Sequence, residues 1–158
     1  MQKDFLKSML ILCKEENLHT AIDTAGNISW ETFEEILPYT NIILYDIKIF
    51  DSQKHKEITG AGNNQILKNL RNLANYNTEI YIRIPIIPTV NDNTDSIIEI
   101  ADFISGLNNK NIKSTELLPF HRLGEWKYRS IGIDYKAKNF NPPSKELISG
   151  LNKILKNF

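Results

Sequence analysis

The feature that most constrains the fold is the apolar run IILYDIK at residues 42–48, which ends in a carboxylate, Asp46, and an ammonium, Lys48. A strand that is apolar on both faces is typical of the centre of a parallel sheet covered by helices. Ligands bind such sheets where the strands end. The run therefore predicts a central parallel strand, and it makes Asp46 and Lys48 candidate site residues.

The same pattern, an apolar run with polar residues in or near its C-terminal half, recurs at three other places. The runs are TAIDTAG at residues 20–26, IYIRIPIIP at 80–88 and TELLPFH at 115–121. Between them, apolar residues recur at helical spacing, so strands and helices alternate along the chain. This alternation predicts an α/β fold with a parallel sheet, in which polar groups from four strands meet in one pocket.

Caps and breakers set the expected boundaries. We predict strands at residues 18–24, 42–48, 79–87 and 111–119, and a first helix at 4–16. Residues able to cap the later helices are Ser29, Asp51 or Ser52, Asn63, Thr94 and Ser144. The aromatic-rich loop at 120–143 is long enough to predict a functional or mobile segment.

Composition excludes several classes of function. The 158 residues are 41% hydrophobic, which predicts a single domain, 1–158, with one core. Lys plus Arg equals Asp plus Glu at 19 each, so no basic field is available for nucleic acid. No uncharged run approaches the roughly 18 residues that a membrane span requires. We therefore expect a cytoplasmic protein that binds neither nucleic acid nor a membrane.

Cys13 is the only cysteine, which excludes an intrachain disulfide and a cysteine-only iron-sulfur site. Helical spacing places it on one face with Phe5, Met9 and Leu12, and this pattern predicts a small core side chain. Two of the three histidines, His19 and His55, are expected to be structural or solvated, with His55 on a solvated helical turn.

Four motifs in order, AIDTAG, LYDIK, IRIPIIPTVND and LLPFHRLGEWKY, together resemble the C-terminal part of the glycyl-radical-enzyme activating enzymes of the pyruvate formate-lyase activating enzyme type. These are radical S-adenosylmethionine (SAM) proteins. The resemblance runs from about residue 5 to the end. It implies a partial TIM-like barrel, with about four strands of a six-stranded (β/α)6 radical SAM barrel. The family's C-x3-C-x2-C motif and Gly-Gly-Glu strand end do not occur in this sequence.

The resemblance also implies an activity. In the family, a [4Fe-4S] cluster and SAM generate a glycyl radical on a partner glycyl radical enzyme such as pyruvate formate-lyase, which is oxidoreductase chemistry. This sequence lacks the cluster-binding region, so we expect no bound cluster and no activity from the chain alone. The exposed barrel edge at residues 18–24 predicts self-association.

When the motifs are matched residue by residue to those of the family, the resemblance implies a SAM-binding site. Asp23, Asp46, Lys48 and His121 are expected to face SAM. A monovalent cation is expected at Asp23, Thr24, Asp46 and the backbone carbonyl of Leu44. Judged from spacing alone, Asp23 and Thr24 could equally form a capping or turn motif.

Two basic residues keep alternatives open. Lys48 could hold an anion, form a Schiff base in a partial-barrel lyase or aldolase, or pair with Asp46. Arg83 could contact an anionic ligand or substrate, or form a buried ion pair with Glu116 or Asp46. A third kind of function is a non-catalytic module whose loop after His121 binds a partner polypeptide.

Overall fold

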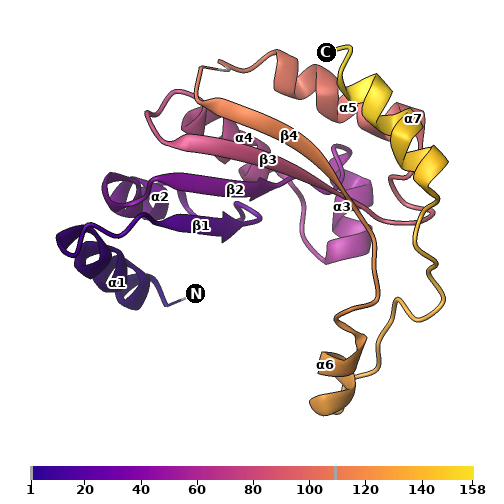
Figure 1. Cartoon of the computed structure of the whole chain (residues 1–158), viewed down its shortest axis with the longest axis horizontal. Helices are drawn as coiled ribbons and strands as arrows, with labels where there is room; N and C mark the ends of the chain where they lie inside the picture. Colours follow the sequence, from indigo (N-terminus) through magenta and orange to yellow (C-terminus); the bar gives the residue numbers. More distant parts are fainter. Residues whose placement is uncertain (1, 109) are drawn as a thin grey trace.

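The computed structural model describes residues 2–108 and 110–158, and its centre is one parallel sheet (Figure 1). Its strands are β1 (Ala21–Thr24), β2 (Ile42–Asp46), β3 (Glu79–Ile86) and β4 (Ile112–Pro119), and they lie in chain order. The helices are α1 (Lys3–Glu15), α2 (Trp30–Ile36), the 3-10 helix η1 (Leu37–Tyr39), α3 (Ser52–Thr59), α4 (Asn64–Leu73), α5 (Thr94–Ser105), α6 (Glu125–Ser130) and α7 (Lys145–Leu155). The sheet is open, which confirms the predicted α/β architecture of four parallel strands in a partial barrel.

The two faces of the sheet differ in burial. On β2 and β3, alternate residues are fully buried, and this core face carries Ile43, Tyr45, Ile80, Ile82, Ile84 and Ile86. The residues between them are only partly buried, and they form the open face of the sheet. Side chains alternate in direction along a strand, so polar residues on the open face can lie beside a continuous apolar core. Figure 1 shows the sheet curved, with α1 near one end and α6 held away from the strands.

Most boundaries agree with the predictions, and two corrections have a physical cause. The first strand begins at Ala21 rather than at residue 18, because Thr20 bonds outside the ladder: its amide donates to Asn41 Oδ1 (2.9 Å) and its hydroxyl donates to the Tyr39 carbonyl (2.9 Å). The cap of α5 is Asn93 rather than Thr94, since the Asn93 side chain accepts from the Ser96 amide (3.0 Å).

Two other predicted caps are confirmed, whereas Ser29 and Asn63 precede α2 and α4 without a side-chain capping hydrogen bond. Asp51 accepts from the amide of Lys54 at the start of α3 (2.6 Å), and Ser144 accepts from the amide of Leu147 at the start of α7 (3.1 Å). Within residues 2–108 and 110–158, no helix is long and apolar enough to cross a membrane.

The predicted buried face of the first helix is wrong. Phe5, Met9 and Leu12 are 65%, 44% and 61% exposed, whereas Leu10 is 4% exposed. Cys13 is partly exposed rather than a fully buried core side chain. The reason is that α1 packs only one side against α2 and η1, which leaves its second apolar stripe without cover in the described part of the chain.

A glycine is required at position 26, just beyond β1, because of its backbone conformation and the close approach of Tyr45. Its φ is +70°, and an added Cβ would lie 1.8 Å from the hydroxyl oxygen of Tyr45. That hydroxyl donates to the Ile66 carbonyl (2.7 Å), and burial raises the pKa of Tyr45 far above its usual value, so the ring is fixed in place as a neutral phenol.

We expect Gly26→Ala to destabilise the fold by about 2–5 kcal/mol, the sum of left-handed backbone strain and overpacking. Gly60→Ala is the matched control, because Gly60 has φ +87° but no atom within 4 Å of an added Cβ, so only the backbone cost of about 1–2 kcal/mol applies. Urea unfolding of both variants measures the difference. Equal losses would mean that Tyr45 moves aside freely.

Candidate functional site

Charged side chains from three strands meet on the open face, at the C-terminal ends of β1 and β2 and in the C-terminal half of β3. Arg83 is at their centre: its Nε and Nη2 donate to Asp46 Oδ1 (2.9 and 2.7 Å), and its Nη2 also donates to Asp23 Oδ1. Lys48 Nζ donates to the second oxygen of Asp46, Oδ2, at 3.3 Å. Sequence analysis predicted all four residues, and they form one hydrogen-bonded cluster.

The sheet register explains this meeting. Asp46 and Arg83 are directly paired positions on β2 and β3, and Asp23 is paired with Leu44 on the next strand. Paired positions of a parallel sheet point to the same face, so the guanidinium reaches both carboxylates. The side chains of Arg83 and Asp46 are 19% and 18% exposed, whereas that of Asp23 is 63% exposed. The hydrogen bond to Asp23, and then that to Asp46, raises the pKa of Arg83.

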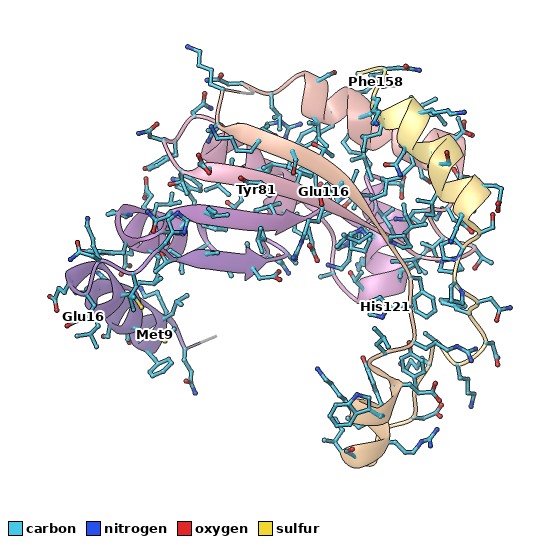
Figure 2. The ribbon with its side chains drawn as sticks, viewed as in Figure 1. Met9, Glu16, Tyr81, Glu116, His121 and Phe158 are labelled. Atoms are coloured by element: carbon cyan, nitrogen blue, oxygen red, sulfur yellow. The ribbon has the colours of Figure 1, made fainter. Side chains whose placement is uncertain are left out.

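Of the structural partners predicted for Arg83, Asp46 is present and Glu116 is not. Glu116 occupies the position paired with Arg83 on β4, but its carboxylate accepts from the Ser114 hydroxyl (3.1 Å) (Figure 2). Sequence analysis did not predict the contact with Asp23, which is 60 residues away in the chain. Arg83 therefore fixes the two carboxylates, and its contact with a ligand stays a prediction.

Lys48 is the more exposed cation of the cluster, and it has hydrogen-bonding capacity to spare. Its side chain is 30% exposed, and of its three N–H donors one is used by Asp46. Lys48 Nζ is engaged by the Asp46 carboxylate, and a Schiff base would require this nitrogen to leave that hydrogen bond. The pairing therefore favours a role in holding an anionic or polar group over covalent catalysis.

Of the remaining predicted site residues, Leu44 lies beside this cluster, whereas the side chains of Thr24 and His121 do not join its hydrogen bonds. Thr24 is paired with Tyr45, so its side chain lies on the core side of the sheet, and its hydroxyl accepts from the Gly26 amide (3.0 Å). Leu44 lies on the open face beside Asp23. His121 is exposed beyond β4, on the stretch that leads to α6, and its Nδ1 accepts from the Leu123 amide (3.3 Å) (Figure 2).

Asn91 holds the strand ends together and was missed by sequence reasoning. Its side chain is fully buried, its Nδ2 donates to the carbonyls of Lys48 (2.6 Å) and Pro85 (2.8 Å), and its Oδ1 accepts from the Ile87 amide (2.6 Å). The available signal was an asparagine in the turn after a strand, since its amide can bond several backbone groups.

The solvated position predicted for His55 is wrong. It is 5% exposed rather than solvated, because the turn after α3 folds back over the ring. His55 lines a pocket of about 170 Å³ together with Asp46 and Lys48. The pocket also contacts Ala25, Asn27, Thr59, Ala61 and Ile66. The charged cluster thus borders a small, defined space.

The residues present do not fit an iron-sulfur cluster, because one cysteine supplies one thiolate where a [4Fe-4S] cube needs at least three. Among residues 2–108 and 110–158, no three His, Cys, Asp or Glu side chains form a metal-binding group. At Asp23 and Asp46 the neutralising charge is the guanidinium of Arg83. A cation at these carboxylates would compete with Arg83 for the same oxygens.

The chain is similar over most of its length to several characterised proteins. It is 40% identical to the pyruvate formate-lyase-activating enzyme of Clostridium pasteurianum over 156 residues, which are 99% of this chain and 64% of that protein. It is 39% identical to the (2S)-3-sulfopropanediol dehydratase activating enzyme of Klebsiella oxytoca, covering 88% of this chain and 44% of that protein. It is 38% identical to a 4-hydroxyphenylacetate decarboxylase activating enzyme of Clostridioides difficile, covering 98% and 48%. The chain thus spans 44–64% of these relatives.

Solved structures agree on the fold. A crystal structure of a domain of pyruvate-formate lyase-activating enzyme from Bacteroides vulgatus superposes with a TM-score of 0.82 at 29% identity, covering 99% of this chain and 86% of that one. A radical SAM methyltransferase from Sphaerobacter thermophilus superposes with a TM-score of 0.67 at 17% identity, covering 93% and 41%, which shows the fold alone. No protein-family model matches the chain.

Proposed function

Because this chain is a homologue of the glycyl-radical-enzyme activating enzymes, we propose that it provides the SAM-facing part of such a radical SAM enzyme, which generates a glycyl radical on a partner enzyme. The observation that carries the proposal is the cluster of Asp23, Asp46, Lys48 and Arg83, at the C-terminal ends of β1 and β2 and beside them on β3. In parallel α/β folds this is the edge at which ligands bind.

The residues of the cluster fit SAM in their chemistry. SAM carries a carboxylate, an ammonium and ribose hydroxyls, and at a radical SAM centre it is the source of the radical. Lys48 has two N–H donors left for an anionic or hydroxyl oxygen, and the exposed carboxylate of Asp23 can accept from an ammonium or a hydroxyl. His121 joins the proposed site from the segment after β4. Arg83 holds Asp23 and Asp46 in position by its hydrogen bonds to both.

The partner and the cation belong to the same proposal. The names of the relatives support a glycyl radical enzyme as partner, and pyruvate formate-lyase is one such enzyme. A monovalent cation would use Asp23, Asp46 and the Leu44 carbonyl, and Thr24, whose side chain lies on the core side of the sheet, could add only its backbone carbonyl. For that, Arg83 would have to give up at least one of its carboxylate hydrogen bonds. The [4Fe-4S] cluster would have to be held by thiolates that this sequence does not contain.

We expect the chain to bind SAM weakly, and Lys48→Ala to lower that affinity by about tenfold, because a hydrogen bond to a charged group is worth about 1.5–3 kcal/mol. Isothermal titration calorimetry on the parent chain and the variant is the measurement. Lys113→Ala is the matched control, since Lys113 is an exposed lysine paired with Glu79 (3.5 Å) at the opposite end of the sheet. Equal SAM affinity in the parent and Lys48→Ala would contradict the placement of SAM at this cluster.

A further inference from the structure

His55 is the best-defined polar group of the 170 Å³ pocket that the proposed function leaves unused. Its Nδ1 lies 2.6 Å from the Ala61 carbonyl oxygen, and a carbonyl oxygen only accepts, so Nδ1 carries the proton. In the tautomer with its proton on Nδ1, Nε2 is unprotonated and its lone pair is a hydrogen-bond acceptor.

Local backbone geometry fixes this tautomer. Gly60 ends α3 in the left-handed conformation, with φ +87°, and this turn brings the Ala61 carbonyl back onto the ring. The Thr59 hydroxyl donates to the His55 carbonyl (2.8 Å) and lies 3.0 Å from Nδ1. It therefore packs against the same edge of the ring as the Ala61 carbonyl. The turn after α3 therefore fixes the buried imidazole of His55 through Nδ1.

The other nitrogen is available to a ligand. Nε2 makes no hydrogen bond within residues 2–108 and 110–158, and it is not among the fully buried polar atoms of the described chain that lack a partner. Because His55 is only 5% exposed and lines the pocket, the pocket is the space from which a ligand would reach Nε2. A buried ring with one fixed and one open nitrogen is a preorganised acceptor.

The pocket favours a small, neutral group. Its volume of about 170 Å³ is a few times the roughly 30 Å³ that one water occupies in the liquid. The charges at its border balance, since the two carboxylates of Asp23 and Asp46 face the two cations Arg83 and Lys48. A group that donates to His55 Nε2 and accepts from Lys48 Nζ would use both of these polar atoms, and Ala25 and Ala61 also line the space.

We propose that His55 Nε2 and Lys48 Nζ bind one main-chain peptide unit of a polypeptide substrate, with the peptide N–H donating to His55 and the peptide carbonyl accepting from Lys48. The inference rests on the proposed function, because an enzyme that acts on a glycyl radical enzyme must bring polypeptide backbone to its site. It adds a polypeptide-binding residue, His55, that the SAM cluster does not include.

Nuclear magnetic resonance of the 15N-labelled chain tests the tautomer and the contact together. We expect the His55 Nε2 signal to be that of an unprotonated nitrogen and to shift saturably when N-acetyl-glycyl-glycine methylamide is added. The signals of His19 and His121 should stay in place. A protonated Nε2, or a His55 signal that responds to SAM and not to the peptide, would overturn the proposal.

Two variants separate binding from structure. His55→Asn keeps an amide donor near the position of Nδ1 for the Ala61 carbonyl but has no atom near Nε2, so we expect the melting temperature to be kept and the peptide affinity to fall about tenfold. His55→Gln places an acceptor near Nε2 and loses the Ala61 contact, so we expect lower stability with peptide binding retained by the folded chain. Unchanged peptide affinity in His55→Asn would overturn the proposal, and SAM binding measured on the same samples tells this failure from failure of the proposed function.

Discussion

Replacing Asn91 by alanine is expected to destabilise the fold by about 3 kcal/mol or more. The change leaves the carbonyls of Lys48 and Pro85 and the amide of Ile87 without their partner, and an unsatisfied buried polar group costs about 1–3 kcal/mol. The ends of β2 and β3 would lose the link that positions Lys48. Urea unfolding followed by circular dichroism measures the loss.

Asn93→Ala is the matched control for this experiment. Asn93 is two residues away and caps α5 through a single exposed hydrogen bond, so its loss should cost about 1 kcal/mol. Asn91→Asp should not restore stability, because a carboxylate cannot donate to two carbonyls. A loss in Asn91→Ala no larger than that in Asn93→Ala would show that water replaces the buried amide.

The second large effect concerns association of the chain with itself. Phe5, Met9 and Leu12 form one exposed apolar face of α1, and in the described chain the outer edge of β1 pairs with no strand. β1 is only four residues long, so the helix face offers more apolar surface than the strand edge does. We expect concentration-dependent association, and a shift to monomer when all three residues are replaced by serine.

Multi-angle light scattering over a concentration series measures this shift. The matched control replaces Leu123, Trp126 and Ile131 by serine, because these residues are 75%, 63% and 68% exposed and lie in or beside α6, away from α1. A parent chain that stays monomeric at millimolar concentration would contradict the prediction. Loss of association in the control variant alone would place the interface at α6.

The parts of the fold that were predictable depend on local sequence. Apolar runs with polar ends located four parallel strands, and the exit of β2 located Asp46 and Lys48, because a strand's end is encoded within a few residues. The face that α1 buries was not predictable, since the stripes containing Leu10 and Phe5 both have helical spacing and only the position of α2 chooses between them.

The parts of the site that were missed depend on contacts between distant residues. The Arg83 contact with Asp23 requires the strand order, which no single segment encodes. The burial of His55 depends on the turn at Gly60, which returns the Ala61 carbonyl to the ring. The lysine and glutamate residues of α3 predict a solvated helix. The turn at Gly60 buries His55 all the same.

The chain order of the strands has a consequence for synthesis on the ribosome. Each strand pairs with the one made just before it, so the sheet can grow strand by strand as the chain emerges, without waiting for a distant segment. Asp23 and Asp46 emerge first and would repel each other across the growing edge. Arg83 arrives only with the third strand, so the neutral, ordered form of the site is completed late, when β3 docks and its guanidinium joins the two carboxylates.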